Sequence, residues 1–358
     1  MKVMIAAGGT GGHIVPAVSL ADILMKEKPD TKIYFFGSSN RMEATVIPEA
    51  GYRFYGVQMT GMTSGVSAKL KSAYSLVKAR RACQHLLELQ KPDILVAFGN
   101  YISVPIVGEA KKMGIPVILH EQNSFAGKAN RFLSGKADAI VCCYESNLEQ
   151  FPKEKCRVYG NPAATLAAEA AFDKEEICRI GLDPEKPFVV FMMGSLGSSS
   201  VSEVIDEACE MFDSTYQIVI AAGKDNDYEF KTKDTGRIKI VPFVNGRSML
   251  KGCALAVTRA GATTMAEIGA IGTCSILIPS PNVANNHQVY NAKELADIGG
   301  AIMIEEKDLT AAKLAETVNW LMSDETERMR IRENARKAGK TDAAYQMIRL
   351  MEELTANG

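Results

Sequence analysis

The sequence has no apolar run long enough to cross a membrane as a helix. Such a span needs about 20 consecutive apolar residues. The run nearest the N-terminus, residues 3–7, is also too short for the core of a signal peptide. We therefore expect any contact with a membrane to be made from its surface.

Cysteine pairs and metal-ligand clusters are missing as well. None of the eight cysteines forms a C-x-x-C pair and most have apolar neighbours, so we expect reduced core thiols in a cytosolic protein. His120 and Glu121 do not start a zinc motif, because Ser124 stands where H-E-x-x-H needs its second histidine. Asp225 and Asp227 form a D-x-D, which some nucleotide-sugar enzymes use to hold a metal, but a solvated loop explains it more simply. We predict no metal site formed by the protein alone.

Acidic side chains are absent from residues 50–87, which we call the basic stretch. Apolar residues at helical spacing, from Val66 to Val77, interleave with its cations. Such a segment could lie on anionic lipid, or it could be a helix with one charged face in a soluble protein. Binding of nucleic acid is disfavoured, because Tyr74 is the only aromatic side chain in the helical pattern. The cations are Arg53, Lys69, Lys71, Lys78, Arg80 and Arg81.

The net charge of −1 hides an uneven distribution along the chain. Residues 1–161 hold 20 lysines and arginines against 13 acidic residues, a net charge of +7. Residues 162–358 hold 21 against 29, a net charge of −8. The first half is therefore the part that an anionic surface or ligand would attract.

What the sequence does contain is a regular alternation of short Val- and Ile-rich runs with helical patterns. Fully apolar strands separated by helices are typical of parallel sheets covered on both faces, and a length of 358 residues suggests two domains. We predict two doubly wound α/β domains, residues 1–161 and 162–341, and a helix within 342–358 whose packing side the sequence leaves open. The expected strands are residues 2–7, 32–37, 94–98, 116–120, 139–143, 188–193, 216–221, 238–241, 254–258, 275–278 and 301–304.

A glycine-rich turn follows the first expected strand. Residues 8–13 read GGTGGH and lead into a helical pattern that starts near Pro16. Backbone amides at a helix start, with no Cβ atoms in the way, are well suited to bind phosphate. The turn is neither a P-loop nor a dinucleotide-binding turn, because no G-K-[ST] follows and Ile14 replaces the third glycine. We expect a ligand site here rather than a merely tight turn.

Polar loops also follow other strands, where ligands of open parallel sheets bind. In the first half these are residues 98–101 and 120–123, the second of which also fits a capped helix start. In the second half, residues 259–267 place Glu267 about two turns into a helix. Glu267 could accept bonds from two ribose hydroxyls, although alone it is explained more simply by a solvated helix face. Residues 279–292 are by default a surface loop.

Several motifs occur in a characteristic order: residues 8–13 (GGTGGH), 41–43 (RME), 120–123 (HEQN), 160–162 (GNP), 259–262 (RAGA) with Glu267, and 287–288 (HQ) with 291–292 (NA). Together they resemble the MurG family, bacterial transferases that add N-acetylglucosamine (GlcNAc) to lipid I to make lipid II. The resemblance implies the two-domain glycosyltransferase B fold, UDP-GlcNAc as donor, and undecaprenyl-diphospho-MurNAc-pentapeptide, lipid I, as acceptor. It also implies peripheral attachment to the anionic inner leaflet at the cytoplasmic face of the bacterial cell membrane, with other cell-wall synthesis proteins as further partners and no nucleic acid.

The resemblance also implies a mechanism and a role for individual residues. In a single inverting displacement, the acceptor 4-hydroxyl attacks C1 of GlcNAc as UDP leaves. His13 is the expected general base, because the ordinary pKa of histidine, about 6.5, suits proton acceptance near neutrality, and Glu121 is the reserve candidate. No tightly bound cofactor is expected, and a divalent cation could assist through the diphosphate. The expected donor-binding residues are Thr10, Gly11, Gly12, Asn123, Ser195, Val244, Ala262, Thr263, Thr264, Met265, Glu267 and Gln288, and the expected acceptor-binding residues are Gly8, Gly9, Gly99, Asn100 and Tyr101.

The chain departs from common patterns of that family at Ala164, Leu196 and Asn100. The rival interpretations are another enzyme of the same fold, such as a diacylglycerol glucosyltransferase, a UDP-GlcNAc 2-epimerase, and a nucleotide-sugar sensor without catalysis. A glucosyltransferase would differ in its donor and acceptor, an epimerase would change the sugar without any acceptor, and a sensor would bind without turnover.

Overall fold

The computed structural model describes residues 1–59, 66–194, 199–223 and 227–356, with the backbone alone for 66–77. Its contacts divide the chain into unit 1, Met1–Leu166 with Asp342–Gly358, and unit 2, Ala167–Thr341. The first crossing between the units therefore lies inside helix α6 (Pro162–Glu169), a few residues beyond the expected position 161. The reason is visible in the packing, since Leu166 contacts the core of unit 1 whereas Ala167 is buried in the core of unit 2.

Unit 1 is built on a parallel sheet of seven strands in the order β3-β2-β1-β4-β5-β6-β7. Central strand β1 pairs with β2 on one side and β4 on the other, so that Val3 lies beside Ile33 and Ile94. The order reverses at β1, which is the doubly wound arrangement. The strands are β1 (Lys2–Ala6), β2 (Lys32–Ser38), β3 (Arg53–Val57), β4 (Ile94–Ala97), β5 (Val117–Glu121), β6 (Ala139–Cys142) and β7 (Cys156–Arg157).

Helices cover both faces of this sheet, which explains why its central strands are apolar along most of their length. One face packs on α3 and α4, through buried residues such as Cys83 and Ile106. The other face packs on α1, α2 and α14, through residues such as Leu20, Ile47 and Met347. The helices of unit 1 besides α6 are α1 (Gly11–Glu27), α2 (Glu43–Glu49), α3 (Val66–Gln90), α4 (Ser103–Lys112), α5 (Lys128–Leu133) and α14 (Ala343–Ala356), with short 3-10 turns at Ser134–Lys136, Glu145–Glu149 and Lys153–Lys155.

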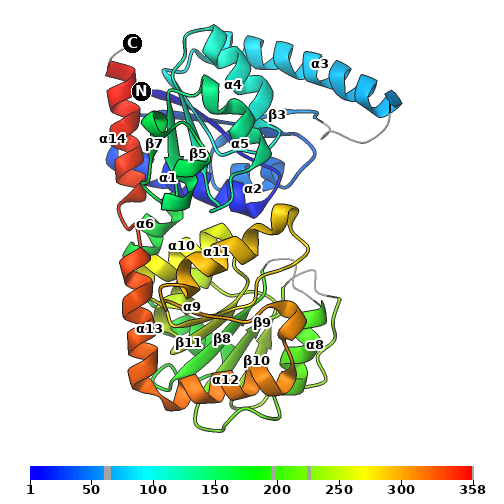
Figure 1. Cartoon of the computed structure of the whole chain (residues 1–358), viewed down its shortest axis with the longest axis vertical. Helices are drawn as coiled ribbons and strands as arrows, with labels where there is room; N and C mark the ends of the chain where they lie inside the picture. The colour runs from blue at the N-terminus through cyan, green and yellow to red at the C-terminus, as the bar shows by residue number, and fades with distance from the viewer. Residues whose placement is uncertain (60–65, 195–198, 224–226, 357–358) are drawn as a thin grey trace. The chain divides into compact units, whose positions relative to one another are not determined.

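Helix α14 settles the packing side that the sequence left open. This C-terminal helix, red in Figure 1, packs against α1. Met347 and Met351 are fully buried in the core that α1 also lines. At its start, the backbone amide of Ala344 donates to Thr165 Oγ1 at 3.0 Å. The C-terminal helix is therefore part of unit 1.

Unit 2 repeats the design with six parallel strands in the order β10-β9-β8-β11-β12-β13. Helices α8 and α12 cover one face of this sheet, and α9, α10 and α11 cover the other (Figure 1). The strands are β8 (Phe188–Met192), β9 (Gln217–Ala221), β10 (Ile238–Val241), β11 (Leu255–Thr258), β12 (Ser275–Leu277) and β13 (Ile302–Met303). The helices are α7 (Lys174–Ile180), α8 (Ser199–Ala208), α9 (Gly246–Gly252), α10 (Ala262–Ile271), α11 (His287–Ala296), α12 (Ala311–Ser323) and α13 (Glu325–Ala338), with 3-10 turns at Ala284–Asn286 and Glu306–Asp308.

The predicted fold class is confirmed, since every expected strand is present in one of two parallel sheets covered by helices. The sequence missed β3 and β7, the two edge strands of unit 1. All eight cysteines are free thiols, as expected, but Cys178 is exposed rather than part of the core. Among the described residues, no helix combines the length and the apolar character that a membrane span requires.

Candidate functional site

The first half of the glycine turn is held by the protein's own side chains. Glu43, at the start of α2, is fully buried and accepts hydrogen bonds from the backbone amides of Gly9 and Ser38, both at 3.0 Å. A Cβ atom on Gly8 would clash with the Glu43 carboxylate, and one on Gly9 would clash with the Asn100 amide. Gly9 also has a φ of +89°, which disfavours any side chain. Gly8 and Gly9 are therefore required by internal packing, whatever they bind.

The second half of the turn has a different environment. A Cβ atom on Gly11 would meet no atom within 4 Å, and one on Gly12 would meet only Thr10 Oγ1 at 3.7 Å. These residues start α1, whose N-cap, Thr10, makes no side-chain capping bond. The first amides of a helix have no partner within it and carry a partial positive charge. Packing therefore leaves room for a ligand against Gly11 and Gly12.

His13 follows directly, and its ring orientation is fixed by Gln122. The two residues meet at 3.2 Å, between His13 Nδ1 and Gln122 Oε1. The amide nitrogen of Gln122 donates to the carbonyl oxygens of Phe98 at 2.9 Å and of His120 at 3.3 Å, so its oxygen must be the atom that faces His13. An amide oxygen only accepts, and Nδ1 therefore carries the proton. In the neutral ring the lone pair then lies on Nε2. This nitrogen is the one that could accept a proton if His13 acts as a general base.

Glu121, the reserve candidate for the base, is committed to its own loop. Its Oε1 accepts from the backbone amide of Asn123 at 3.1 Å, and its Oε2 accepts from the amide of Gly127 and from Asn130 Nδ2, both at 2.9 Å. The residue is 1% exposed. Both oxygens of this carboxylate therefore hold the loop after β5 in place. Asn123, predicted to contact the donor, lies in the same loop, where its Nδ2 is 3.4 Å from Glu121 Oε1.

His120 is a structural residue behind this loop. Its Nε2 lies 3.0 Å from the carbonyl oxygen of Gly160, to which it donates, and the ring packs against Phe98. Its Nδ1 is buried with no hydrogen-bond partner in the described part of the chain. Burial lowers the pKa of His120 to about 4, and the nearby charge of His13 acts in the same direction. The ring is therefore neutral at physiological pH.

Residues 99–101 form the other loop beside the glycine turn. Gly99 and Asn100 both have left-handed backbones, with φ values of +86° and +66°. Asn100 Nδ2 donates to the carbonyl oxygen of Gly8 at 3.1 Å, and its Oδ1 accepts from the backbone amide of Tyr101 at 2.6 Å. Asn100, one of the departures from the family pattern, therefore ties this loop to the glycine turn. The predicted acceptor-binding residues of unit 1 are brought together, although their contact with an acceptor stays a prediction.

In unit 2, the predicted donor residues gather around the starts of α10 and α11. Val244 and Met265 are buried in one core cluster, while Thr263 and Thr264 lie in the first turn of α10 and are partly exposed. Neither helix has a side-chain cap, whereas α7, α9, α12 and α13 each have one. The caps of those four helices are Asp173, Asn245, Thr310 and Asp324.

Glu267 does not lie on a solvated helix face, so the simpler interpretation of this residue is wrong. Its side chain is 13% exposed and its Oε1 accepts from Arg247 Nε at 2.8 Å. Burial raises the pKa of Glu267, and the charge of Arg247 opposes that effect. The result is a largely buried ion pair between α9 and α10.

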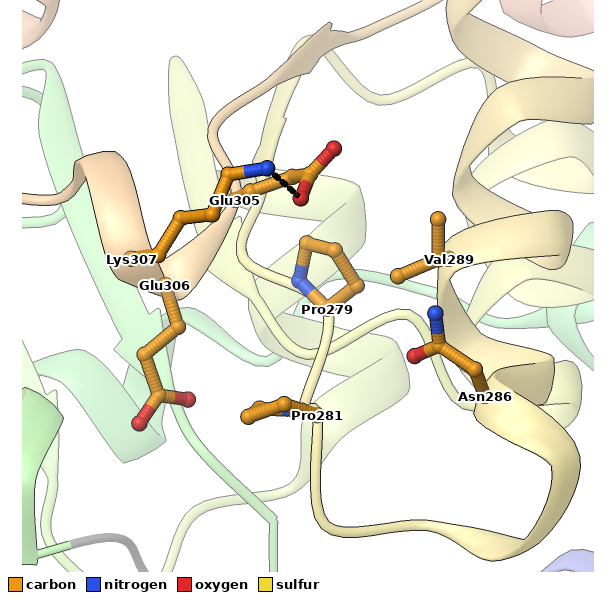
Figure 2. A pocket seen from close by; sticks show the side chains of 7 residues that line it. All are labelled: Pro279, Pro281, Asn286, Val289, Glu305, Glu306 and Lys307. Carbon is orange, nitrogen blue, oxygen red and sulfur yellow. Dashed lines mark ion pairs between the residues drawn. The ribbon is translucent and has the colours of Figure 1, made fainter.

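Gln288 shapes the loop between β12 and α11. Its Oε1 accepts from the backbone amide of Ser280 at 2.9 Å, between Pro279 and Pro281. These prolines line a cavity of about 360 Å³, shown in Figure 2 between Val289 and the ion pair of Glu305 with Lys307. Its size is that of a small-ligand site. The loop is thus a structured cavity wall held by Gln288, more than a plain surface loop.

Some predicted residues cannot be placed. Ser195 and the departure at Leu196, together with Asp225 of the D-x-D, lie outside the described residues. Within the described ranges, no group of three or more metal-ligating side chains could hold an ion. The other departure, Ala164, is buried in α6.

Three residues that organise the site were missed by sequence reasoning. Glu43 supports the glycine turn, Gln122 fixes the His13 ring, and Arg247 pairs with Glu267. Glu43 and Gln122 do stand inside the short motifs noted in the sequence, but no role was predicted for them. Arg247 lies outside every motif, and its only signal is that it comes three residues after Val244.

Two family models match the chain. The glycosyltransferase family 28 N-terminal domain matches residues 3–142, and the glycosyltransferase family 28 C-terminal domain matches residues 188–347. The first match covers most of the seven-stranded sheet of unit 1, and the second covers the six-stranded sheet of unit 2. Together they cover most of its length.

Curated relatives match over the whole chain. One from Bacillus cereus is 36% identical over 99% of each chain, and is named UDP-N-acetylglucosamine--N-acetylmuramyl-(pentapeptide) pyrophosphoryl-undecaprenol N-acetylglucosamine transferase 1. A relative of the same type from Limosilactobacillus fermentum is 33% identical over 100% of this chain and 99% of its own. Among solved structures, MurG of Acinetobacter baumannii superposes with a TM-score of 0.77 at 24% identity, covering 98% of this chain and 99% of that one.

Proposed function

Because the chain belongs to the MurG family of glycosyltransferase family 28, we propose that it transfers GlcNAc from UDP-GlcNAc to the 4-hydroxyl of MurNAc in lipid I, forming lipid II. The observation that carries this proposal is the match to relatives of that name over the full length of both chains. The loops around His13 and Glu267 support it, since an oriented imidazole can take a proton from a hydroxyl group and a carboxylate can accept hydrogen bonds from hydroxyl groups.

The test is incubation of the protein with labelled UDP-GlcNAc and a lipid I analogue. We expect release of UDP together with a disaccharide on the lipid. Transfer of glucose to diacylglycerol, or conversion of UDP-GlcNAc to its 2-epimer without any acceptor, would replace this proposal with a rival enzyme. Binding of UDP-GlcNAc with neither product would indicate a sensor.

His13 is the general base in this proposal. The Gln122 contact leaves the lone pair of the neutral ring on Nε2, where it can take the proton of the attacking hydroxyl. The inverting reaction is one displacement, so the bond from the acceptor oxygen to C1 forms as the bond from C1 to the UDP oxygen breaks. Glu121 is set aside, because its carboxylate already accepts several hydrogen bonds.

The leaving diphosphate would be stabilised by backbone amides. Helices α10 and α11 start without a side-chain cap, and helix starts attract anions. Glu267, Gln288 and Asn123 would hold the ribose and GlcNAc hydroxyls. A divalent cation would assist through the diphosphate itself, which a titration of the transfer rate with EDTA and then magnesium would test.

We also propose that the basic stretch contacts an anionic membrane at the cytoplasmic face. Helix α3 carries exposed Lys78, Arg80 and Arg81, while Lys69 and Lys71 have no described side chains. The charge of Arg80 is partly neutralised, since its Nε donates to Glu109 Oε1 at 2.7 Å. Lys112 Nζ shares the same carboxylate, 3.1 Å from Glu109 Oε2. Among the described cations of α3, Lys78 and Arg81 therefore have the most to gain from anionic lipid, about 1 kcal/mol each near a charged surface.

Flotation with vesicles tests the membrane proposal. We expect binding to vesicles that contain phosphatidylglycerol and none to pure phosphatidylcholine. The double variant Lys78→Glu with Arg81→Glu should lose binding, whereas Lys186→Glu with Lys313→Glu, two exposed lysines of unit 2, should keep it. Equal binding by both variants would remove the basic stretch from this role.

A further inference from the structure

The ion pair of Arg247 with Glu267 joins two segments of unit 2 that come together only in the fold. Arg247 lies in the first turn of α9, three residues after Val244, and Glu267 lies in the middle of α10. The contact runs from Arg247 Nε to Glu267 Oε1 at 2.8 Å, with 28% of the arginine and 13% of the glutamate side chain exposed. It links the segment of Val244 to the helix that carries Met265, and both of these residues are buried in the same core cluster.

The geometry leaves the carboxylate able to do more than pair with the arginine. Arg247 meets it through one nitrogen and one oxygen, Oε1. A carboxylate offers about four acceptor positions on two oxygens, so a pair of neighbouring hydroxyls can still donate to it. The arginine would then fix the rotamer of the glutamate without taking all of its acceptor capacity.

We propose that Arg247 is a positioning residue for donor recognition, which keeps Glu267 ionised and oriented to accept the two ribose hydroxyls of a uridine nucleotide. This inference rests on the proposed function, because it assumes a uridine nucleotide as the ligand. It adds a residue that none of the sequence motifs contains.

The physical reason is the cost of a buried charge. An isolated carboxylate at this depth would favour its protonated form, which accepts hydrogen bonds less well. Helix α10 packs against α9, α11 and α13. Of the charged side chains that these helices carry in the described structure, Arg247 is the one that lowers the pKa of Glu267, against the raising effect of burial.

The experiment measures how well the protein recognises the ribose hydroxyls. Calorimetry with UDP and with 2′,3′-dideoxy-UDP gives the ratio of the two affinities, for the wild type and for the variants Arg247→Met and Arg247→Lys. We expect the wild type to prefer UDP by about tenfold or more, since hydrogen bonds to a charged group are among the stronger ones. Arg247→Met should lower this ratio to within about threefold, and Arg247→Lys, which keeps the charge, should restore most of it.

The dependence on pH adds a second readout. Without Arg247 the pKa of Glu267 rises further, so UDP binding by Arg247→Met should be weakest at pH 6 and recover toward pH 9. The wild type should change less over this range. In transfer assays, Arg247→Met should raise the KM for UDP-GlcNAc more than it lowers kcat, because the ribose contact is made before and during the reaction.

Two results would overturn the inference. One is a variant Arg247→Met that keeps the preference for UDP, and the other is an equal loss of both nucleotides at every pH, which would mean a structural role only. Failure of the proposed function is separate. A wild type that prefers UDP over its dideoxy analogue through Arg247, yet transfers no GlcNAc to lipid I, would sustain the inference and reject the reaction.

Discussion

The glycine turn before α1 and the turn before α10 both follow strands inside a parallel sheet, although β11 corresponds in position to β4 of unit 1 rather than to β1. Each follows a central strand, β1 or β11, and each starts a helix without a side-chain cap. They differ in what surrounds them. The turn of unit 1 is held by Glu43 and Asn100 and leads to an oriented histidine, whereas the α10 turn leads to a carboxylate paired with an arginine.

The difference suggests a division of labour between similar frames. A proton acceptor needs a fixed tautomer and position, which the turn of unit 1 provides through Gln122. Recognition of hydroxyl groups needs an ionised acceptor with spare lone pairs, which Glu267 provides. In the proposed reaction, the same strand-turn-helix unit would support chemistry in one half of the chain and binding in the other.

The largest effect should come from removing the histidine, which has no counterpart at the α10 turn. We expect His13→Ala to reduce transfer to lipid I by about a thousandfold, within the range for a lost general base. UDP-GlcNAc binding by calorimetry should stay close to that of the wild type. His85→Ala, which removes an exposed histidine of α3, is the matched control, and unchanged turnover in His13→Ala would end the assignment.

We expect acid to destabilise unit 1 before unit 2, because unit 1 contains the buried ring of His120. The pKa of this buried ring is about 4 in the folded protein, below the ordinary value of about 6.5, so the unfolded chain binds the proton more strongly. The contribution of the neutral ring to the free energy of unfolding is complete above pH 6.5. It is lost as the pH falls toward 4, by about 3 kcal/mol in total.

Hydrogen exchange can resolve this difference between the units. Between pH 6.5 and 4, amides of β5 should lose protection while those of β11 change less, and the fluorescence of Trp320, the single tryptophan, reports on unit 2. His120→Gln should be less stable at pH 7 but should show a flatter pH dependence. A wild type with equal acid sensitivity in both units would contradict the role of His120.

The glycines of the first turn should divide into two pairs. Gly9→Ala places a Cβ against Asn100 at a φ of +89°, and we expect it to lower the free energy of unfolding by about 2 kcal/mol. Gly11→Ala meets no atom within 4 Å and should change stability by no more than about 0.5 kcal/mol, while reducing transfer if a ligand approaches there. Thermal unfolding and transfer assays on the same preparations test both. Equal stability of the two variants would show that the turn is not held as described.

The smallest effect concerns Asn100, which ties the two loops of unit 1. Asn100→Gly removes the hydrogen bonds to Gly8 and from the Tyr101 amide, worth about 1 kcal/mol each, but relieves a left-handed backbone at a gain of about 1 kcal/mol. The free energy of unfolding should therefore fall by no more than about 1 kcal/mol, whereas the KM for the lipid I analogue should shift by about two- to threefold as the turn loosens. Denaturant unfolding and acceptor titrations measure the two quantities, and a large loss of stability would mean that the hydrogen bonds dominate.

Most of the strands that sequence predicted are buried on both faces, although β10 and β13, the partly exposed edge strands of unit 2, were predicted as well. Runs such as residues 94–97 are entirely apolar because helices cover both sides of the sheet there. The missed strand β3 reads RFYGV and is partly exposed along its length, and β7 is only two residues long. A polar first residue and an internal glycine in β3, and the short length of β7, leave too little apolar pattern for a prediction.

Sequence patterns could single out candidate residues but not the contacts between them. The glycine turn, His13 and Glu267 follow strands or start helices, which a pattern can reveal. The bonds that give them their properties join residues far apart in sequence, 34 positions from Gly9 to Glu43 and 109 from His13 to Gln122. Such contacts depend on the order of strands in the sheet, which no local pattern encodes.

The position of helix α14 at the end of the sequence affects the order in which the two units can fold during synthesis. Unit 2 is a continuous insertion between Leu166 and Asp342, and synthesis from the N-terminus therefore completes it before α14 appears. The face of α1 that Met347 and Met351 cover stays without its partner during that time, so we expect unit 2 to reach its fold on the ribosome first. Because unit 2 is one continuous segment, it could be replaced by the corresponding segment of a relative with only two junctions in the chain.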